Sequence, residues 1–292
     1  MQKKITLKQQ IDAYGEMTKP RIVSLVLVTT FLGYYLGGEG IGSWGALIYL
    51  LSGACLVCAG SGVLNNYLER EVDCKMSRTK MRPIPIGTVT AANALGFGLL
   101  LVLLGIIILY LKTNLLTAFL SLLTAFLYVL VYTPMKKVSW LNTTIGSIPG
   151  AIPPMGGWVA ATGNIDLGAW VLFAILFFWQ HPHFYAIAWM YREDYKLGGF
   201  KMLPVLEPDG RKTFLCILWC AAILIPVSLL PTWIGLSGKI YFTGALVSGA
   251  GLFWLGAILA RTKSMNDAHR LLKATVFYLP ILLVLIIIDV NF

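Results

Sequence analysis

The chain has 292 residues, of which 58% are hydrophobic and only 12% are charged. Because a soluble domain carries about 25% charged residues, this composition excludes an ordinary water-soluble protein and requires lipid to cover much of the surface. The formal net charge is +10, and since the basic residues fall between apolar runs, the excess favours orientation in a bilayer over nucleic-acid binding.

The N-terminal segment, residues 1–21, is polar and lacks the apolar core of a signal peptide, so we expect a cytoplasmic segment of a single membrane domain covering 1–292. Nine apolar stretches follow, which predicts an all-α polytopic membrane protein with nine helices around a central cavity open to the cytoplasm. The stretches are 22–38, 45–66, 91–111, 115–132, 142–161, 168–190, 214–235, 240–260 and 274–290. The fifth is rich in Gly and Pro, so we expect it to be a broken helix that lines the cavity.

The basic residues test this number of spans independently. With nine spans, 21 of the 23 Lys and Arg residues fall on the side of the N-terminus, and only Lys112 and Lys239 fall on the other. Since cytoplasmic loops carry an excess of Lys and Arg, this split predicts a cytoplasmic N-terminus and a C-terminus on the outer side. Without the fifth span, the basic residues of 191–213 would lie outside. The sequence therefore favours nine spans, in a bacterial inner membrane.

Acidic residues gather on the same side, where the second span ends. Asn65, Glu69 and Asp73 are spaced by four residues, so they lie on nearly one face of a helix. Carboxylates that point the same way at the membrane boundary repel each other unless a cation neutralises them, and hard oxygen ligands suit Mg²⁺ together with substrate phosphates. A solvated helix end with local ion pairs, such as Glu71 with Arg70, is the alternative that spacing alone leaves open.

Basic residues flank this acidic face at the same depth. Arg78 and Arg82 follow it in the loop, and Lys136 and Lys137 end the fourth span. An Arg side chain binds phosphate oxygens through two N–H groups, whereas Lys acts as a point charge, so these four residues are candidates for binding a diphosphate. Ordinary positive-inside charge is the alternative, and we favour it for Lys80.

The sixth span carries two histidines, His181 and His183, on either side of Pro182, which is expected to kink the helix. Ionisable residues inside a membrane are rare and often functional. Because residues two apart do not share a helix face, the two are not expected to bind one metal ion together. Asp194 follows His183 by eleven residues, about three turns, and would share its face if the helix persisted. A hydrogen-bonded interhelical histidine is the alternative for each.

Taken together and in this order, the motifs resemble those of the UbiA-type intramembrane prenyltransferases, and among them the branch that farnesylates haem b. The resemblance covers nearly the whole chain and is carried by residues 65–73, 78–83, 132–137, 179–184, 194–195 and 202–205. The family's first acidic motif is Asn-x3-Asp-x3-Asp, and here the middle position is Glu69. Members that prenylate aromatic rings carry a second Asp-rich motif after the sixth span, where this chain has His-Pro-His and then Glu193-Asp194, a departure that favours haem.

The resemblance implies a prenyltransferase that moves a farnesyl group from farnesyl diphosphate to a vinyl group of haem b, giving haem O and diphosphate. It implies catalytic and Mg²⁺-binding roles for Asn65, Glu69, Asp73 and Asp194, diphosphate binding by Arg78, Arg82, Lys136 and Lys137, and haem contact by His181 or His183. The implied partners are farnesyl diphosphate, haem b, the lipid bilayer and a downstream haem-modifying enzyme or terminal oxidase. Nucleic acid is not expected.

Three other functions remain open. A sister enzyme that prenylates an aromatic acid or a quinone precursor would use the same acidic face without haem. A membrane transporter would use the fifth span and the intramembrane histidines as a substrate path, but it predicts charges near the middle of several spans, whereas nearly all acids lie at the inner ends. A structural membrane subunit would not need the acidic face.

Overall fold

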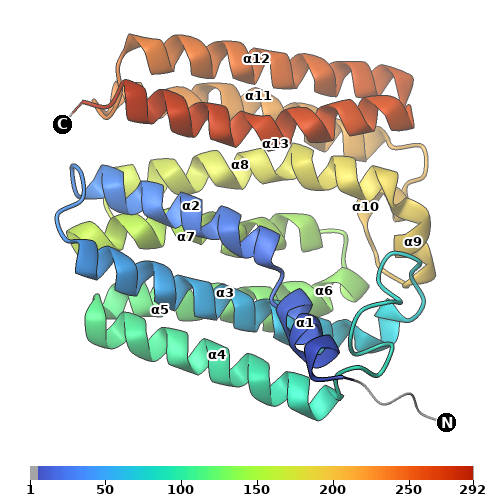
Figure 1. The fold of residues 1–292 in the computed structure, drawn as a ribbon. Helices are drawn as coiled ribbons and strands as arrows, with labels where there is room; N and C mark the ends of the chain where they lie inside the picture. The colour runs from blue at the N-terminus through green and yellow to red at the C-terminus, as the bar shows by residue number, and fades with distance from the viewer. Residues whose placement is uncertain (1–5, 292) are drawn as a thin grey trace.

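The protein is a bundle of long helices that run side by side (Figure 1). The computed structural model describes residues 6–291, and within them the only extended pairing is an isolated bridge between Ser237 and Val290. In this described part of the chain, eight segments are long and apolar enough to cross a membrane: α2 (Pro20–Gly37), α3 (Trp44–Asp73), α4 (Ala91–Lys112), the run Leu115–Val138, α8 (Leu167–Met190), α11 (Arg211–Trp233), α12 (Lys239–Thr262) and α13 (Met265–Ile288). The predicted all-α, multi-pass membrane fold is confirmed.

The run Leu115–Val138 is one span made of three pieces. It consists of α5 (Leu115–Phe126), a π-helical segment η1 (Leu127–Tyr132) and α6 (Thr133–Val138). A π-helical turn holds one more residue than an α-helical turn, and such turns are frequent at functional sites. The widened turn comes just before the two lysines that the sequence singles out.

The fifth predicted span is helix α7 (Asn142–Thr162), which packs against α2, α5 and α8 inside the bundle. Its Gly and Pro residues make it less apolar than the eight other spans, so the number nine stays a prediction. The expected break in this helix is wrong, because α7 runs through Pro149, Pro153 and Pro154 without interruption. Prolines free carbonyl groups, and in a membrane these turns are tolerated where neighbouring helices cover them.

Glycines allow α2 and α7 to pack closely against each other. A Cβ atom at Gly157 of α7 would overlap the carbonyl oxygen of Thr30 in α2, and a Cβ atom at Gly33 of α2 would overlap that of Pro154. Helices in lipid associate through this kind of close packing between small residues, because the hydrophobic effect does not drive them together there.

Replacing Gly157 with Ala is expected to destabilise the protein, since overpacking of a close contact costs about 1–3 kcal/mol. Gly156→Ala is the matched control: a Cβ atom there meets nothing within 4 Å, and Ala favours the helix. The measurement is the fraction of detergent-purified protein that stays monodisperse after heating. Equal thermal stability of the two variants would contradict the close contact of α2 with α7.

The N-terminal segment, which we expected to be polar and cytoplasmic, forms helix α1 (Leu7–Met17). Residues 1–5 lie outside the described residues. A capping box starts it: the Thr6 hydroxyl accepts a hydrogen bond from the Gln9 backbone, and the Gln9 side chain accepts one from Thr6 N. Met17 is buried in a cluster with Val63 of α3. Helix α1 therefore covers one end of the bundle (Figure 1).

Two short helices, α9 (Arg192–Leu197) and α10 (Leu203–Leu206), follow α8 at this same end (Figure 1). Helix α8 passes through Pro182 but stops at Met190. The condition for Asp194 to share a face with His183 is therefore not met, because Asp194 lies on a separate helix. Met76, in the loop after α3, is buried against Phe200 and Met202, so the two loops pack together.

Candidate active site

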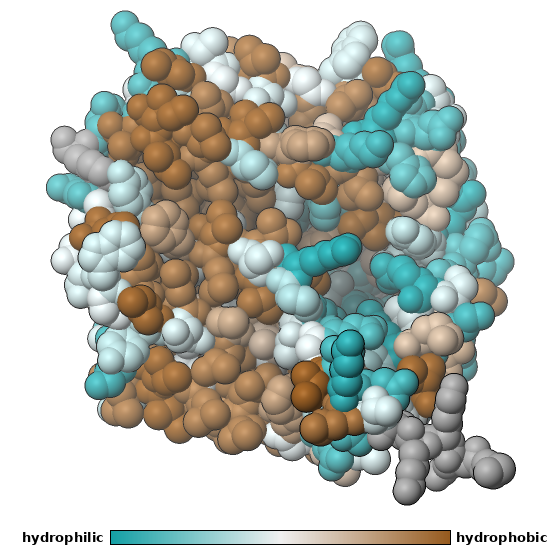
Figure 2. All heavy atoms as spheres, in the orientation of Figure 1, coloured by the Kyte–Doolittle hydropathy of each residue, from teal (hydrophilic) through white to brown (hydrophobic). Residues whose placement is uncertain are grey.

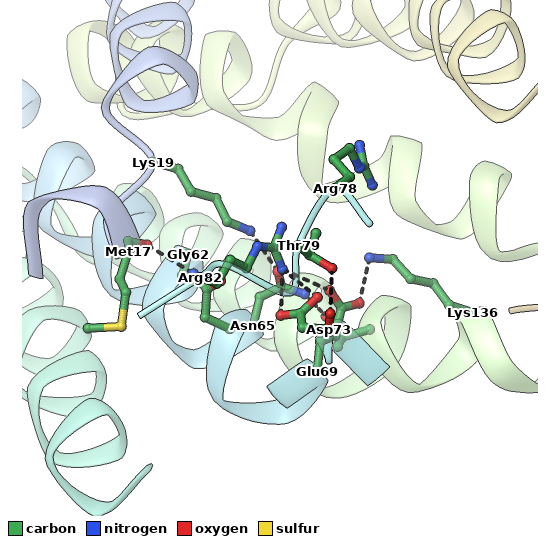
Figure 3. A network of polar contacts seen from close by, with 12 residues as sticks. Met17, Lys19, Gly62, Asn65, Glu69, Asp73, Arg78, Thr79, Arg82 and Lys136 are labelled. Carbon is green, nitrogen blue, oxygen red and sulfur yellow. Dashed lines mark hydrogen bonds and ion pairs between the residues drawn. The ribbon is translucent and has the colours of Figure 1, made fainter. Parts of the chain in front are cut away.

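The last turns of α3 carry the predicted acidic face into the protein. Asn65, Glu69 and Asp73 are buried, with exposed fractions of 1%, 5% and 0%. They point to one side of the helix, as their spacing predicts (Figure 3). A buried carboxylate is costly unless it is paired and hydrogen-bonded, so the surroundings of these side chains must supply positive charge.

Two cations from distant segments supply it. Lys136 of α6 places its Nζ 2.7 Å from Glu69 Oε1. Arg82, in the loop after α3, donates from one nitrogen to both Asp73 oxygens at 2.7 and 2.9 Å, and that nitrogen lies 3.8 Å from Glu69 Oε2. The structure thus brings two of the four predicted diphosphate-binding residues onto the two central carboxylates.

Lys19 is a third cation, which the sequence did not single out. Its Nζ donates to Asn65 Oδ1 at 2.6 Å and to the Tyr128 hydroxyl at 3.3 Å. Burial, together with the positive charge of Arg82, lowers the pKa of Lys19 to about 7, although the negative charge of Glu69 raises it. Because three cations face two carboxylates, the cluster favours an additional anion, and an anion nearby favours the protonated lysine.

The backbone explains why Lys19 escaped notice. Lys19 is the N-cap of α2 and adopts a left-handed conformation, with φ of 56° and ψ of 59°, directly before Pro20. That turn brings the side chain back toward α3 (Figure 3). The sequence shows only a lysine next to the first span, and the positive-inside rule accounts for such a lysine as well as a role in the site does.

The junction of the π-helical segment with α6 contacts Asn65 and Lys136. The Asn65 amide donates from Nδ2 to the Thr133 hydroxyl at 3.0 Å while its Oδ1 accepts from Lys19, so both ends of the amide are fixed. The Tyr132 ring lies 4.6 Å from the Lys136 ammonium, a cation–π distance. Thr133 and Tyr132 were missed as site residues because their roles depend on the irregular turn of η1.

Three predicted site residues lie apart from the carboxylates. Arg78 stacks over the rings of Tyr191 and Tyr195, at 5.1 and 5.5 Å, and stands away from the acidic pair in Figure 3. Lys137 is exposed and has no ion pair among the described residues. Asp194 Oδ1 accepts a 2.6 Å hydrogen bond from the Ser77 hydroxyl.

The structure groups Asn65, Glu69 and Asp73 on α3 and places Asp194 against the loop after α3, so a metal site formed by all four stays a prediction. Among residues 6–291, no three His, Cys, Asp or Glu side chains are grouped so that they could hold a metal ion. Asp194 is the residue that departs, because α8 ends before it and α9 directs it to the loop after α3. In this structure Asp194 contacts that loop through the Ser77 hydroxyl.

The remaining donors still fit Mg²⁺. Glu69, Asp73 and Asn65 offer hard oxygen atoms on one helix face, and Mg²⁺ usually takes one or two carboxylates plus substrate phosphates. Each carboxylate is now neutralised by Lys136 or Arg82. A metal–diphosphate complex brings positive charge for the carboxylates and negative charge for these two cations, so it satisfies the same groups.

A cavity of about 270 Å³ adjoins the charged cluster on the side of α1. It is lined by Glu16, Met17, Lys19, Ile22, Asn66, Arg82 and Pro83. Figure 2 shows hydrophilic side chains gathered around a hollow at this end, while apolar side chains cover most of the rest of the face. This cavity lies at the end of the bundle, where its lining cations Lys19 and Arg82 also contact Asn65 and Asp73, while the central cavity stays a prediction.

The histidines lie on different sides of α8. His181 is buried, with Nδ1 2.8 Å from the Phe177 carbonyl oxygen and Nε2 3.4 Å from the Thr144 hydroxyl of α7. His183 is half-buried, with Nδ1 2.8 Å from the Thr275 hydroxyl of α13. They therefore do not meet at one point, as their spacing predicts.

Comparison with known proteins gives a match over most of the chain. The sequence model of the UbiA prenyltransferase family matches residues 26–281. The protoheme IX farnesyltransferase of Solibacter usitatus is 43% identical, covering 94% of this chain and 98% of its own. The protoheme IX farnesyltransferase of Salinibacter ruber is 42% identical with the same coverage of both chains.

Solved structures have the same fold. A digeranylgeranylglyceryl phosphate synthase superposes with a TM-score of 0.81 over 96% of this chain and 98% of its own, at 18% identity. A UbiA homolog from Archaeoglobus fulgidus, determined with GPP and Mg²⁺ bound, superposes with a TM-score of 0.60 over 92% of this chain and 99% of its own, at 16% identity.

Proposed function

This chain belongs to the UbiA prenyltransferase family, and we propose that it transfers the farnesyl group of farnesyl diphosphate to a vinyl group of haem b, giving haem O. The observation that carries the proposal is the 43% identity over 94% of the chain to a protein named protoheme IX farnesyltransferase. The charged cluster at the end of α3 supports the diphosphate half of the reaction, because it combines oxygen ligands with three cations.

The bonds that change define what the site must do. The C1–O bond of farnesyl diphosphate breaks, C1 bonds to the terminal vinyl carbon of haem b, and water adds to the other vinyl carbon with loss of a proton. The products are haem O, diphosphate and that proton. The hard part is the departure of the diphosphate, which leaves positive charge on the allylic carbon and builds negative charge on the leaving oxygen.

The residues of α3, the loop after it and α6 divide this task. Glu69, Asp73 and Asn65 hold Mg²⁺, which when bound supplies positive charge to the leaving diphosphate. Lys136 and Arg82 leave their carboxylates for the phosphate oxygens, and Arg82 can bind them through two N–H groups. Thr133 keeps the Asn65 amide oriented, since it accepts a hydrogen bond from Nδ2.

Lys19 joins these cations as a diphosphate-binding residue. We expect Lys19→Met to raise the KM for farnesyl diphosphate by about 10- to 100-fold, because a hydrogen bond to a charged group is worth about 1.5–3 kcal/mol. Lys8→Met is the control, since Lys8 is exposed on α1. Initial rates of farnesyl transfer at varied substrate concentration measure the effect. Unchanged KM in the Lys19 variant would remove it from the site.

The membrane placement follows from charge. We propose that the chain is one prenyltransferase domain in a bacterial inner membrane, with the charged end, including α1, in the cytoplasm. Of 23 basic residues, 21 belong to segments of this side. A cytoplasmic mouth gives the diphosphate substrate access to Lys19 and Arg82, which line the cavity there. A downstream haem-modifying enzyme or terminal oxidase then takes up haem O.

The proposal is tested by supplying the purified protein with farnesyl diphosphate, Mg²⁺ and either haem b or 4-hydroxybenzoate, and identifying the product by mass. We expect one farnesyl group and one water added to haem b, no adduct on 4-hydroxybenzoate, and no product after removal of Mg²⁺ with a chelator. An adduct on 4-hydroxybenzoate without one on haem would replace haem with an aromatic acceptor.

A further inference from the structure

The two histidines of α8 differ in how many of their ring nitrogens have a hydrogen-bond partner. In His181, Nδ1 faces the Phe177 carbonyl oxygen, which only accepts, and Nε2 has the Thr144 hydroxyl as a partner. The ring is 4% exposed and lies between α8 and α7. Both nitrogens of His181 are therefore engaged within the bundle.

In His183, the hydrogen bonds determine the tautomer. The Thr275 hydroxyl donates its one proton to the Leu272 carbonyl oxygen at 2.6 Å, so toward His183 it acts as an acceptor. His183 Nδ1 therefore carries the proton and donates it across 2.8 Å to Thr275. In the neutral imidazole, the lone pair is then at Nε2.

The ring is also fixed from its face. Trp179 stacks on His183 with a centroid distance of 5.0 Å and an interplanar angle of 22°. The Trp179 Nε1–H donates to the Thr275 carbonyl oxygen at 2.8 Å, so the same α13 residue holds both rings. Helices α8 and α13 are packed side by side at this level (Figure 1). His183 is thus held in one orientation before any ligand arrives.

The Nε2 atom of His183 has no hydrogen-bond partner among residues 6–291, and the residue is only half-buried. A histidine that donates one ring N–H to a protein acceptor and keeps its other nitrogen free has the arrangement of a metal ligand, because that hydrogen bond fixes the tautomer and makes the free nitrogen more basic. Imidazole is a usual axial ligand of haem iron.

We propose that His183 Nε2 is an axial ligand of the haem b iron, and that Thr275 and Trp179 are positioning residues that orient it. This inference rests on the proposed function, since it concerns the acceptor substrate. His181 serves the helix packing instead. His183 precedes Tyr191 by eight residues, which is about 12 Å along α8. Since Tyr191 contacts Arg78, His183 lies in the apolar part of α8, beyond the charged end.

The test is the absorption and electron paramagnetic resonance spectrum of ferric haem b titrated into the purified full-length protein. Wild type should give a histidine-ligated spectrum. His183→Ala should lose it, and added imidazole should restore it by filling the space of the missing ring. His269→Ala is the matched control, because His269 is the chain's other histidine and is exposed on α13. His181→Gln should keep the wild-type spectrum.

Thr275 gives a second, independent readout. Thr275→Val keeps the shape but removes the acceptor, so we expect haem affinity to fall by about 10- to 100-fold, the usual effect of losing such a hydrogen bond. Thr275→Ser should restore it. Binding of an unreactive farnesyl diphosphate analogue with Mg²⁺ shows that each variant is folded, since that site lies on other helices.

The outcomes separate this inference from the proposed function. An unchanged haem spectrum and affinity in His183→Ala overturns the ligand assignment, and so does loss of histidine ligation in His181→Gln with retention in His183→Ala. If the wild type farnesylates haem but shows no histidine ligation, the inference falls and the function stands. If the wild type neither binds nor farnesylates haem, both fall.

Discussion

Replacing Asp73 with Asn is expected to reduce farnesyl transfer by at least about 10²–10³-fold, the usual effect of removing one preorganised charge from a catalytic site. Asn keeps the shape of the side chain but loses the negative charge. Asp73 is fully buried and paired with Arg82 at 2.7 Å, so its charge has no substitute beyond Glu69. The measurement is kcat with farnesyl diphosphate and haem b at saturating Mg²⁺.

Glu71→Gln is the matched control on the same helix. The Glu71 side chain is 81% exposed and lies 3.7 Å from Arg70, and an exposed ion pair of this kind is worth about 0–1 kcal/mol. We expect wild-type turnover and thermal stability from this variant. Substantial turnover by a folded Asp73→Asn protein would contradict the assignment of the metal site.

The adjacent lysines of α6 are expected to differ sharply. Lys136→Met should lower kcat/KM by about 10²–10³-fold, because it removes a cation that contacts Glu69 in the free protein and a phosphate oxygen in the complex. Lys137→Met should have little effect, since Lys137 is exposed and makes no ion pair within residues 6–291. Rates at varied farnesyl diphosphate concentration measure both variants.

The Lys136 variant also tests the acidic pair. Removing the lysine leaves the buried Glu69 with Arg82, at 3.8 Å, as its one ion-pair partner among residues 6–291, so we expect lower thermal stability without Mg²⁺ and partial recovery when Mg²⁺ is added. Equal losses from the Lys136 and Lys137 variants would mean that general positive charge, rather than a defined phosphate contact, explains the two lysines.

Much of the fold and part of the site could be predicted from sequence because both depend on regular spacing. Runs of apolar residues predict spans, since a helix satisfies its own backbone in lipid. The four-residue spacing of Asn65, Glu69 and Asp73 places them on one face wherever the helix continues, and α3 continues to Asp73. Arg82 and Lys136 could be proposed because charges are few in this chain and these lie beside the acidic face.

The other features of the site depend on irregular backbone, which the periodicity of the sequence does not predict. Lys19 reaches Asn65 through a left-handed turn, and Thr133 reaches it from the first position of α6, directly after a π-helical segment. Asp194 contacts the loop after α3 rather than continuing the face of His183, because α8 stops four residues before it, and its metal-binding role stays a prediction. The break expected in α7 was wrong because composition gives the prolines but not the neighbouring helices that cover them.

The most direct test of the central claim is a calorimetric titration of the purified protein with an unreactive thio analogue of farnesyl diphosphate, with Mg²⁺ and with chelator. If Glu69 and Asp73 hold the metal that holds the diphosphate, wild type binds the analogue only when Mg²⁺ is present, and Asp73→Asn fails to bind it in either condition. Equal affinity with and without Mg²⁺, or wild-type affinity in the Asp73 variant, would contradict the account.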